Sequence, residues 1–158
     1  MKRNLSLFLF VISFLILGIS SYAQPVAHLS VDQSSIQENG GSTKLVVTLK
    51  NSSGAIENAT SVTNATITFS GDAVNGTDYT ISNLTSSTDN IISIPVGESS
   101  GFLTITATND NLVESNEKIL AEITSINVGT INNINKDREI EILDCLLYTS
   151  DAADEWLR

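Results

Sequence analysis

The feature that most constrains the fold is the alternation of apolar and polar residues in short runs. In residues 65–70, an apolar side chain at every odd position alternates with a hydroxyl side chain at every even position. Residues 43–49 and 101–107 repeat the same period of two. Successive side chains of a strand point to opposite faces of a sheet, so this period predicts strands with one buried and one exposed face.

Runs of this kind recur along most of the chain, separated by Gly, Asn, Asp and Ser, and no helical period of useful length appears among them. Several short strands at roughly ten-residue spacing, with turn residues between them, are typical of a β-sandwich. The sequence therefore predicts an all-β fold, an immunoglobulin-like antiparallel β-sandwich of about seven strands. The runs that support this prediction are residues 26–31, 43–49, 65–70, 76–81, 91–94, 101–107, 118–126 and 138–143.

The N-terminus predicts a secretory signal peptide over residues 1–23. Lys2 and Arg3 precede an apolar run over residues 5–19, and Ser21 and Ala23 form a small-residue cleavage pattern. The apolar run is short for a membrane-spanning helix, and no Cys follows it to carry a lipid. We therefore expect cleavage after Ala23 and a secreted or cell-surface protein, of the type exported by bacteria.

The last residues of the chain do not continue the strand pattern. Residues 145–158 hold the only Cys and the only Trp of the chain, Cys145 and Trp156. The run CLLYTSDAADE resembles translated adapter sequence from DNA library preparation. We interpret residues 145–158 as a non-native tail and assign one β-sandwich domain to residues 24–144.

Charge and cysteine usage narrow the class of function. The chain carries 18 Asp and Glu against 8 Lys and Arg, a formal net charge of −10 at pH 7. Such an excess repels nucleic acid and favours cations. The domain has no cysteine although it is expected in an oxidising compartment, so a bound metal or packing against neighbouring domains must replace disulfides as a source of stability.

Residues 109–117 hold the densest group of oxygen ligands. The segment reads NDNLVESNE, with three carboxylates and three side-chain amides between two predicted strands. Ca²⁺ takes roughly six to eight oxygen ligands from Asp, Glu, Asn and backbone carbonyls. The segment therefore indicates a calcium-binding loop, and the alternative is an acidic loop that is simply solvated.

Three motifs together resemble the Calx-beta domain, the calcium-binding β-sandwich of sodium–calcium exchangers, integrin subunits and many bacterial surface proteins. The motifs are SIQENGGSTKLVVTL, ATITFSGDAVNGTDYT and ITATNDNLVESNEKILAEI, which lie in this order along the predicted domain. The resemblance implies a calcium site at one end of the sandwich. Carried over position by position, its ligands are Glu38, Asp78, Asp110, Glu114, Glu117 and Asp144.

This chain departs from the family pattern at two positions. Asn109 and Asn116 stand where the family often has acids, so the site has fewer charges and should bind calcium more weakly. The family also tends to continue with further Asp residues where the tail begins here. Catalysis has no candidate, because the single histidine, His28, lies in a predicted strand with no Ser–His–Asp order around it.

The function that these observations favour is an exported calcium-binding module of a larger protein, acting in adhesion or as a structural spacer. Its partners would be calcium ions, neighbouring domains of the same chain, and cell-surface proteins or glycans. An alternative is an accessory domain of an exported hydrolase whose catalytic domain lies downstream. A carbohydrate-binding module is a third alternative, although residues 24–144 lack the aromatic platform on which sugars stack.

Overall fold

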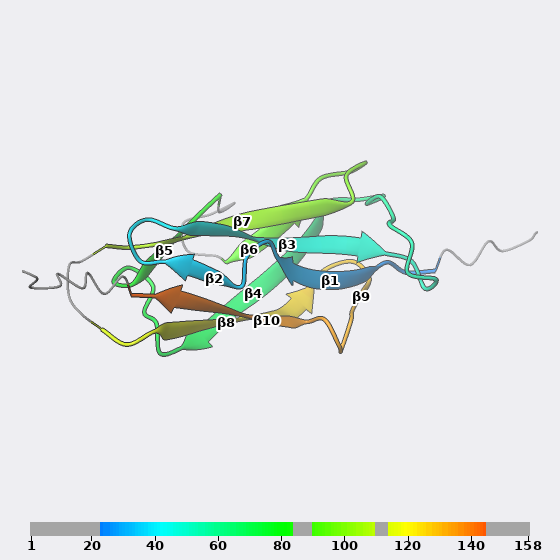
Figure 1. Cartoon of the computed structure of the whole chain (residues 1–158). Helices are drawn as coiled ribbons and strands as arrows, with labels where there is room; N and C mark the ends of the chain where they lie inside the picture. The colour runs from blue at the N-terminus through cyan, green and yellow to red at the C-terminus, as the bar shows by residue number, and fades with distance from the viewer. Residues whose placement is uncertain (1–22, 84–89, 110–113, 145–158) are drawn as a thin grey trace, which may run out of the picture.

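The computed structural model describes residues 23–83, 90–109 and 114–144, which form two stacked β-sheets (Figure 1). The described residues contain no helix, so none of them forms a helix that could span a membrane. The predicted all-β sandwich is confirmed. Apart from Ala23, the predicted signal peptide lies outside the described residues, as does the predicted tail. The ten strands are β1 (Val26–Val31), β2 (Ser35–Gln37), β3 (Ser42–Lys50), β4 (Thr63–Gly71), β5 (Tyr79–Ser82), β6 (Ile91–Ile94), β7 (Ser100–Ala107), β8 (Glu117–Ile126), β9 (Thr130–Ile131) and β10 (Asp137–Leu143).

Each sheet holds five strands. The first has the order β5-β7-β3-β1-β9 and the second the order β2-β10-β8-β4-β6. The long strands pair antiparallel, as predicted. The structure adds two short parallel pairings at sheet edges, β1 with β9 and β10 with β2.

The core lies between the sheets and consists almost wholly of aliphatic side chains. Leu45, Val47 and Leu49 of β3 are fully buried, and the residues between them are exposed or half-buried. β7 repeats this pattern with Leu103 and Ile105. Burial of a Val, Leu or Ile side chain contributes about 1.5–3 kcal/mol to stability. The alternate apolar residues of each strand supply these buried side chains, so the period of two seen in the sequence is the main determinant of the fold.

The two ends of the sandwich differ in the chain segments that they carry. β1 starts at one end, where the Pro25 carbonyl accepts a hydrogen bond from Thr130 N at 2.9 Å. β10 finishes at the other end, close to where β2 finishes and β8 begins (Figure 1). The described domain therefore begins and finishes at opposite ends.

Candidate metal centre

Three connections between strands, and the segment that follows β10, bring acidic residues to the end of the sandwich where β10 finishes (Figure 1). Glu38 follows β2, and Asp78 directly precedes β5. Glu114 and Glu117 lie where the chain enters β8, and Asp144 directly follows β10. Antiparallel sheets place alternate turns at the same end, so residues far apart in sequence meet here.

Three of these carboxylates lie close together. Asp78, Glu114 and Glu117 each offer an oxygen, and the three oxygens lie within 4.8 Å of one another. Glu38 and Asp144 line the same small cavity, without belonging to this closest group. Asp110 lies outside the described residues. The structure thus brings five of the six predicted ligands to one cavity, and their role as metal ligands stays a prediction.

Among the described residues, the rest of the cavity wall carries no cation. Its other described lining residues are Thr108, Ser115 and Ile142, and no described Lys or Arg is among them. The two salt bridges of the described residues, Lys118–Glu139 and Lys136–Glu122, use carboxylates that do not line the cavity. Asp78, Glu114 and Glu117 therefore form no salt bridge among the described residues, and a bound cation would neutralise such a group.

Asp78 is held by its own loop. Its Oδ2 accepts a hydrogen bond from the backbone N–H of Val74 at 2.6 Å. Its backbone N–H donates to the Val74 carbonyl at 2.9 Å, and its carbonyl accepts from Thr108 N at 2.8 Å. These contacts leave the second carboxylate oxygen for the cluster and join the loop to the end of β7.

Asp144 and Glu38 connect the end of β10 to the other loops. Asp144 Oδ2 accepts a hydrogen bond from Glu114 N at 2.7 Å, which fixes the start of the segment that leads into β8. The backbone N–H of Glu38 donates to the Leu143 carbonyl at 3.0 Å and so extends the pairing of β2 with β10. The loop carrying Glu114 is therefore attached to the strand that leaves the domain.

The pKa of Glu117 is shifted by burial and by the neighbouring acidic side chains. Its pKa is raised from the usual 4.5 to about 7, first because burial disfavours its charged form. The charges of Asp78, Glu114 and Asp72 raise it further, and so does a side-chain hydrogen bond with Asp78. Without a cation, the cluster therefore favours a proton on Glu117 near neutral pH.

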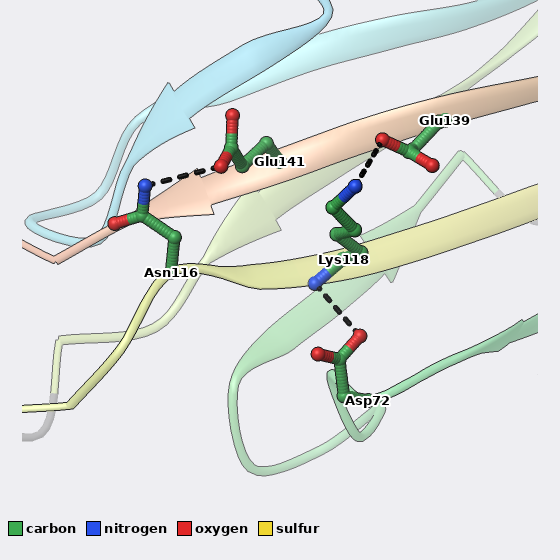
Figure 2. Close-up of polar contacts among 5 residues, drawn as sticks. All are labelled: Asp72, Asn116, Lys118, Glu139 and Glu141. Atoms are coloured by element: carbon green, nitrogen blue, oxygen red, sulfur yellow. Dashed lines mark hydrogen bonds and ion pairs between the residues drawn. The ribbon is translucent and has the colours of Figure 1, made fainter.

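Lys118, the basic residue next to Glu117 in the sequence, directs its side chain away from the acidic cavity. Lys118 Nζ pairs with Glu139 at 2.8 Å, while its backbone N–H donates to Asp72 Oδ1 at 3.2 Å (Figure 2). Asn116 Nδ2 donates to Glu141 Oε1 at 3.0 Å on the same face (Figure 2). Alternation along β8 sends the Lys118 side chain away from the cavity, so it cannot neutralise the cluster.

Sequence reasoning missed Asp72 as part of this electrostatic environment. Asp72 lies within the second motif of the resemblance, directly after β4, but it has no counterpart in the predicted ligand set. Its carboxylate caps Lys118 N and adds to the field that raises the pKa of Glu117. Its place six residues before Asp78 in one acidic loop was the available signal.

The arrangement suits cation binding. Carboxylate, hydroxyl and backbone oxygens are the ligands that hard cations prefer. His28 lies in β1, half-buried, with Nε2 3.5 Å from the Asn132 side-chain amide. It does not line the acidic cavity.

Comparisons with solved structures agree on the fold, whereas two comparisons of sequence found no match. No protein-family model matches the chain, and neither does any curated protein sequence. The chain is similar to the apo-form Calx CBD1 domain, with a TM-score of 0.57 and 16% identity over 77% of this chain and 98% of that chain. It is also similar to the Calx CBD2 domain, with a TM-score of 0.54 and 12% identity over 81% of this chain and 91% of that one.

A third similar structure is the calcium binding domain CBD12 of CALX1.1, with a TM-score of 0.55 and 16% identity over 76% of this chain. The chain spans 44% of that structure's length. Together the matches define the class: a β-sandwich with a Calx-beta-like fold. At these identities the likeness concerns the fold alone.

Proposed function

We propose that this chain is an exported calcium-binding β-sandwich module of a larger cell-surface or secreted protein, acting in adhesion or as a structural spacer and not as an enzyme. The observation that carries the proposal is the meeting of Asp78, Glu114 and Glu117 oxygens within 4.8 Å of one another, in a cavity that no Lys or Arg of the described part of the chain lines. Carboxylates this close repel one another unless a proton or a bound cation neutralises part of their charge.

Calcium fits the cavity better than magnesium. The acidic lining residues come from three separate connections, from the start of β8 and from the segment after β10, and they differ in side-chain length, which suits the variable coordination of Ca²⁺. Mg²⁺ demands near-ideal octahedral geometry and keeps several waters. The CBD12 structure of CALX1.1 is itself named a calcium binding domain, which supports the same assignment for a similar fold.

Thermal unfolding of the full chain tests the proposal. A ligand that binds only the folded state, at about a hundredfold above Kd, adds roughly 2.7 kcal/mol. For a domain of this size that corresponds to a Tm rise of roughly 5–10 °C. We expect such a rise with added calcium, a smaller one with magnesium, and a return to the starting Tm after chelation.

A variant pair makes the test specific. Asp78→Asn combined with Glu117→Gln removes two clustered charges, so the calcium-induced rise in Tm should be largely lost. Glu98→Gln is the matched control, because Glu98 is exposed and lies outside the cavity lining. Equal Tm values for the unchanged chain in calcium and in chelator would rule out the cation site and leave the sandwich fold unaffected.

The basic start, apolar run and small-residue pattern of residues 1–23 support export. Expression with the native N-terminus in a bacterial host, followed by fractionation and N-terminal sequencing, tests it. We expect material outside the cytoplasm that begins at Gln24. Intact chain confined to the cytoplasm would contradict the proposal.

Partners at the cell surface belong to the same proposal. The CBD12 structure, of which this chain spans 44%, supports neighbouring domains as one class of partner. Cell-surface proteins and glycans are the other class. Binding of the calcium-loaded chain to intact cells, compared with the same chain in chelator, tests for them.

A further inference from the structure

The turn after β2 carries an Asn-Gly step at its tip, directly beside the acidic cavity. Glu38, which lines the cavity, is followed by Asn39 and Gly40, and β3 begins shortly afterwards at Ser42. We propose that Asn39 is a site of spontaneous deamidation, which converts its side-chain amide into a carboxylate through a cyclic imide formed with the Gly40 backbone nitrogen.

The tip of this turn is open while its base is held. Gly41 N donates to the Gln37 carbonyl at 2.9 Å, and the Gly41 carbonyl accepts from Ala107 N at 2.9 Å. Asn39 and Gly40 are both exposed, and no hydrogen bond among the described residues holds the Asn39 side chain. A Cβ placed on Gly40 would meet no atom within 4 Å, so the tip has room to change conformation.

Among the residues that the structure describes, the Gly40 nitrogen makes one hydrogen bond, and that bond is local. Gly40 N donates to the Glu38 carbonyl at 2.7 Å, only two residues back. Rotation of the Asn39–Gly40 peptide can break this bond without disturbing β2 or β3. Gly40 has a φ of +89°, and glycine crosses between regions of φ and ψ more freely than any other residue. The nitrogen can thus reach the side chain of Asn39.

The chemistry needs only water and a base from solvent. The Gly40 N–H gives its proton to hydroxide, and the nitrogen attacks Cγ of Asn39. The bond from Cγ to the side-chain nitrogen breaks, that nitrogen takes up a proton, and ammonia leaves behind a five-membered imide. Water then opens the imide at Cγ to give aspartate, or at the backbone carbonyl to give isoaspartate. One water enters and one ammonia leaves, with no change in oxidation state.

A second Asn-Gly step offers an internal comparison. Asn75 and Gly76 are also exposed, but Gly76 N donates to the carbonyl of the buried Tyr79 at 2.7 Å. Asn75 and Tyr79 form a parallel bridge, and the same loop is held by the Val74–Asp78 hydrogen bonds. Attack by the Gly76 nitrogen would have to disrupt the entry to β5, so conversion at Asn75 should be slower than at Asn39.

Conversion would change the acidic end of the domain. This step rests on the proposed function. A new carboxylate beside Glu38 adds to the repulsion among the clustered acids, and isoaspartate also lengthens the backbone of the turn. The converted form should therefore have a lower Tm in chelator than the unconverted form, and a larger rise in Tm on addition of calcium.

Peptide mapping of the aged full chain tests the modification itself. The chain is incubated in mildly alkaline buffer with chelator, once folded and once in urea, and the Asn, Asp and isoaspartate forms of each peptide are separated by mass spectrometry. In urea, Asn39 and Asn75 should convert at similar rates. In the folded chain, Asn39 should convert several-fold faster than Asn75.

Two variants show which asparagine releases the ammonia. Asn39→Gln should remove the fast release of ammonia, because a Gln side chain would have to form a larger ring, and Asn75→Gln should leave it unchanged. Folded conversion at Asn75 that equals or exceeds conversion at Asn39 would overturn the inference, as would an unconverted Asn39 after both sites react in urea. Because the rate is measured in chelator, a failure of the cation proposal would leave this result intact.

Discussion

At the scale of single residues, Glu117 connects the electrostatics of the acidic end to protons and cations. Burial and the neighbouring Asp78, Glu114 and Asp72 charges raise its pKa to about 7. A proton or a divalent cation can relieve the same repulsion, so the two ligands should compete. Calcium binding to the cluster should accordingly release protons near neutral pH.

This shift predicts a pH dependence of the metal-free chain. The folded pKa of Glu117 lies above its usual value, so the folded state holds more protons than the unfolded state between pH 4.5 and about 7. The contribution of Glu117 to the free energy of unfolding is therefore full below pH 4.5 and falls as the pH rises to about 7. Urea denaturation in chelator, at a series of pH values, measures it.

Glu117→Gln provides the comparison for that measurement. The variant cannot titrate, so the difference in unfolding free energy between it and the unchanged chain should vary with pH in the window from 4.5 to about 7. A pH-independent difference for Glu117→Gln would contradict the raised pKa.

Several residues of the acidic end could be anticipated from the sequence through the resemblance of their motifs. Asp144 also directly follows the predicted run 138–143, and Asp78 lies within the predicted run 76–81, whereas Glu38 adjoins only the short β2. The place of Asp72 in the same loop as Asp78 was visible in the sequence, but its contact with Lys118 N was not, because that contact depends on the approach of β4 to β8 across the sheet. Such a contact between residues distant in sequence leaves no local pattern.

At the scale of elements, the close approach of β4 to β8 depends on Gly71. Gly71 has a φ of +125°, and a Cβ there would overlap the carbonyl oxygen of Lys118. Gly71→Ala should therefore force the two strands apart where Asp72 caps Lys118 N. We expect a loss of about 2–4 kcal/mol in unfolding free energy, measured by urea denaturation.

Gly54→Ala is the matched control for backbone strain alone. Gly54 has a φ of +85°, but a Cβ there would meet no atom within 4 Å. The left-handed conformation costs a non-glycine residue roughly 1–2 kcal/mol. A loss for Gly71→Ala no larger than that for Gly54→Ala would show that the contact with Lys118 is unimportant.

The elements also show what the period of two can predict. The eight runs identified in the sequence correspond to β1, β3, β4, β5, β6, β7, β8 and β10, although residues 76–78 lie in a turn before β5. β2 and β9 were not predicted, because they span three and two residues and pair only along sheet edges. A strand with one buried side chain, Ile36 in β2, cannot display a period.

At the scale of the whole molecule, net charge predicts a response to salt. The chain has a formal net charge of −10 at pH 7, and self-repulsion destabilises a compact state. Potassium chloride should raise the Tm of the metal-free chain, because a Debye length near 8 Å at about 0.15 M screens surface charges. The rise should be smaller with calcium bound. An equal rise in Tm for the metal-free and the calcium-bound chain would show that the charge repulsion arises outside the acidic end.

The opposite placement of the first and last strands has a mechanical consequence. A pull between the two ends of the domain acts along β1 and β10, and each of these strands is hydrogen-bonded antiparallel to a long neighbour, β3 and β8. Antiparallel hydrogen bonds lie perpendicular to the strands, so such a pull shears them together and does not open them one after another. This geometry resists tension. A pull on β10 passes through Asp144, which directly follows that strand and accepts a hydrogen bond from Glu114 N at the acidic end.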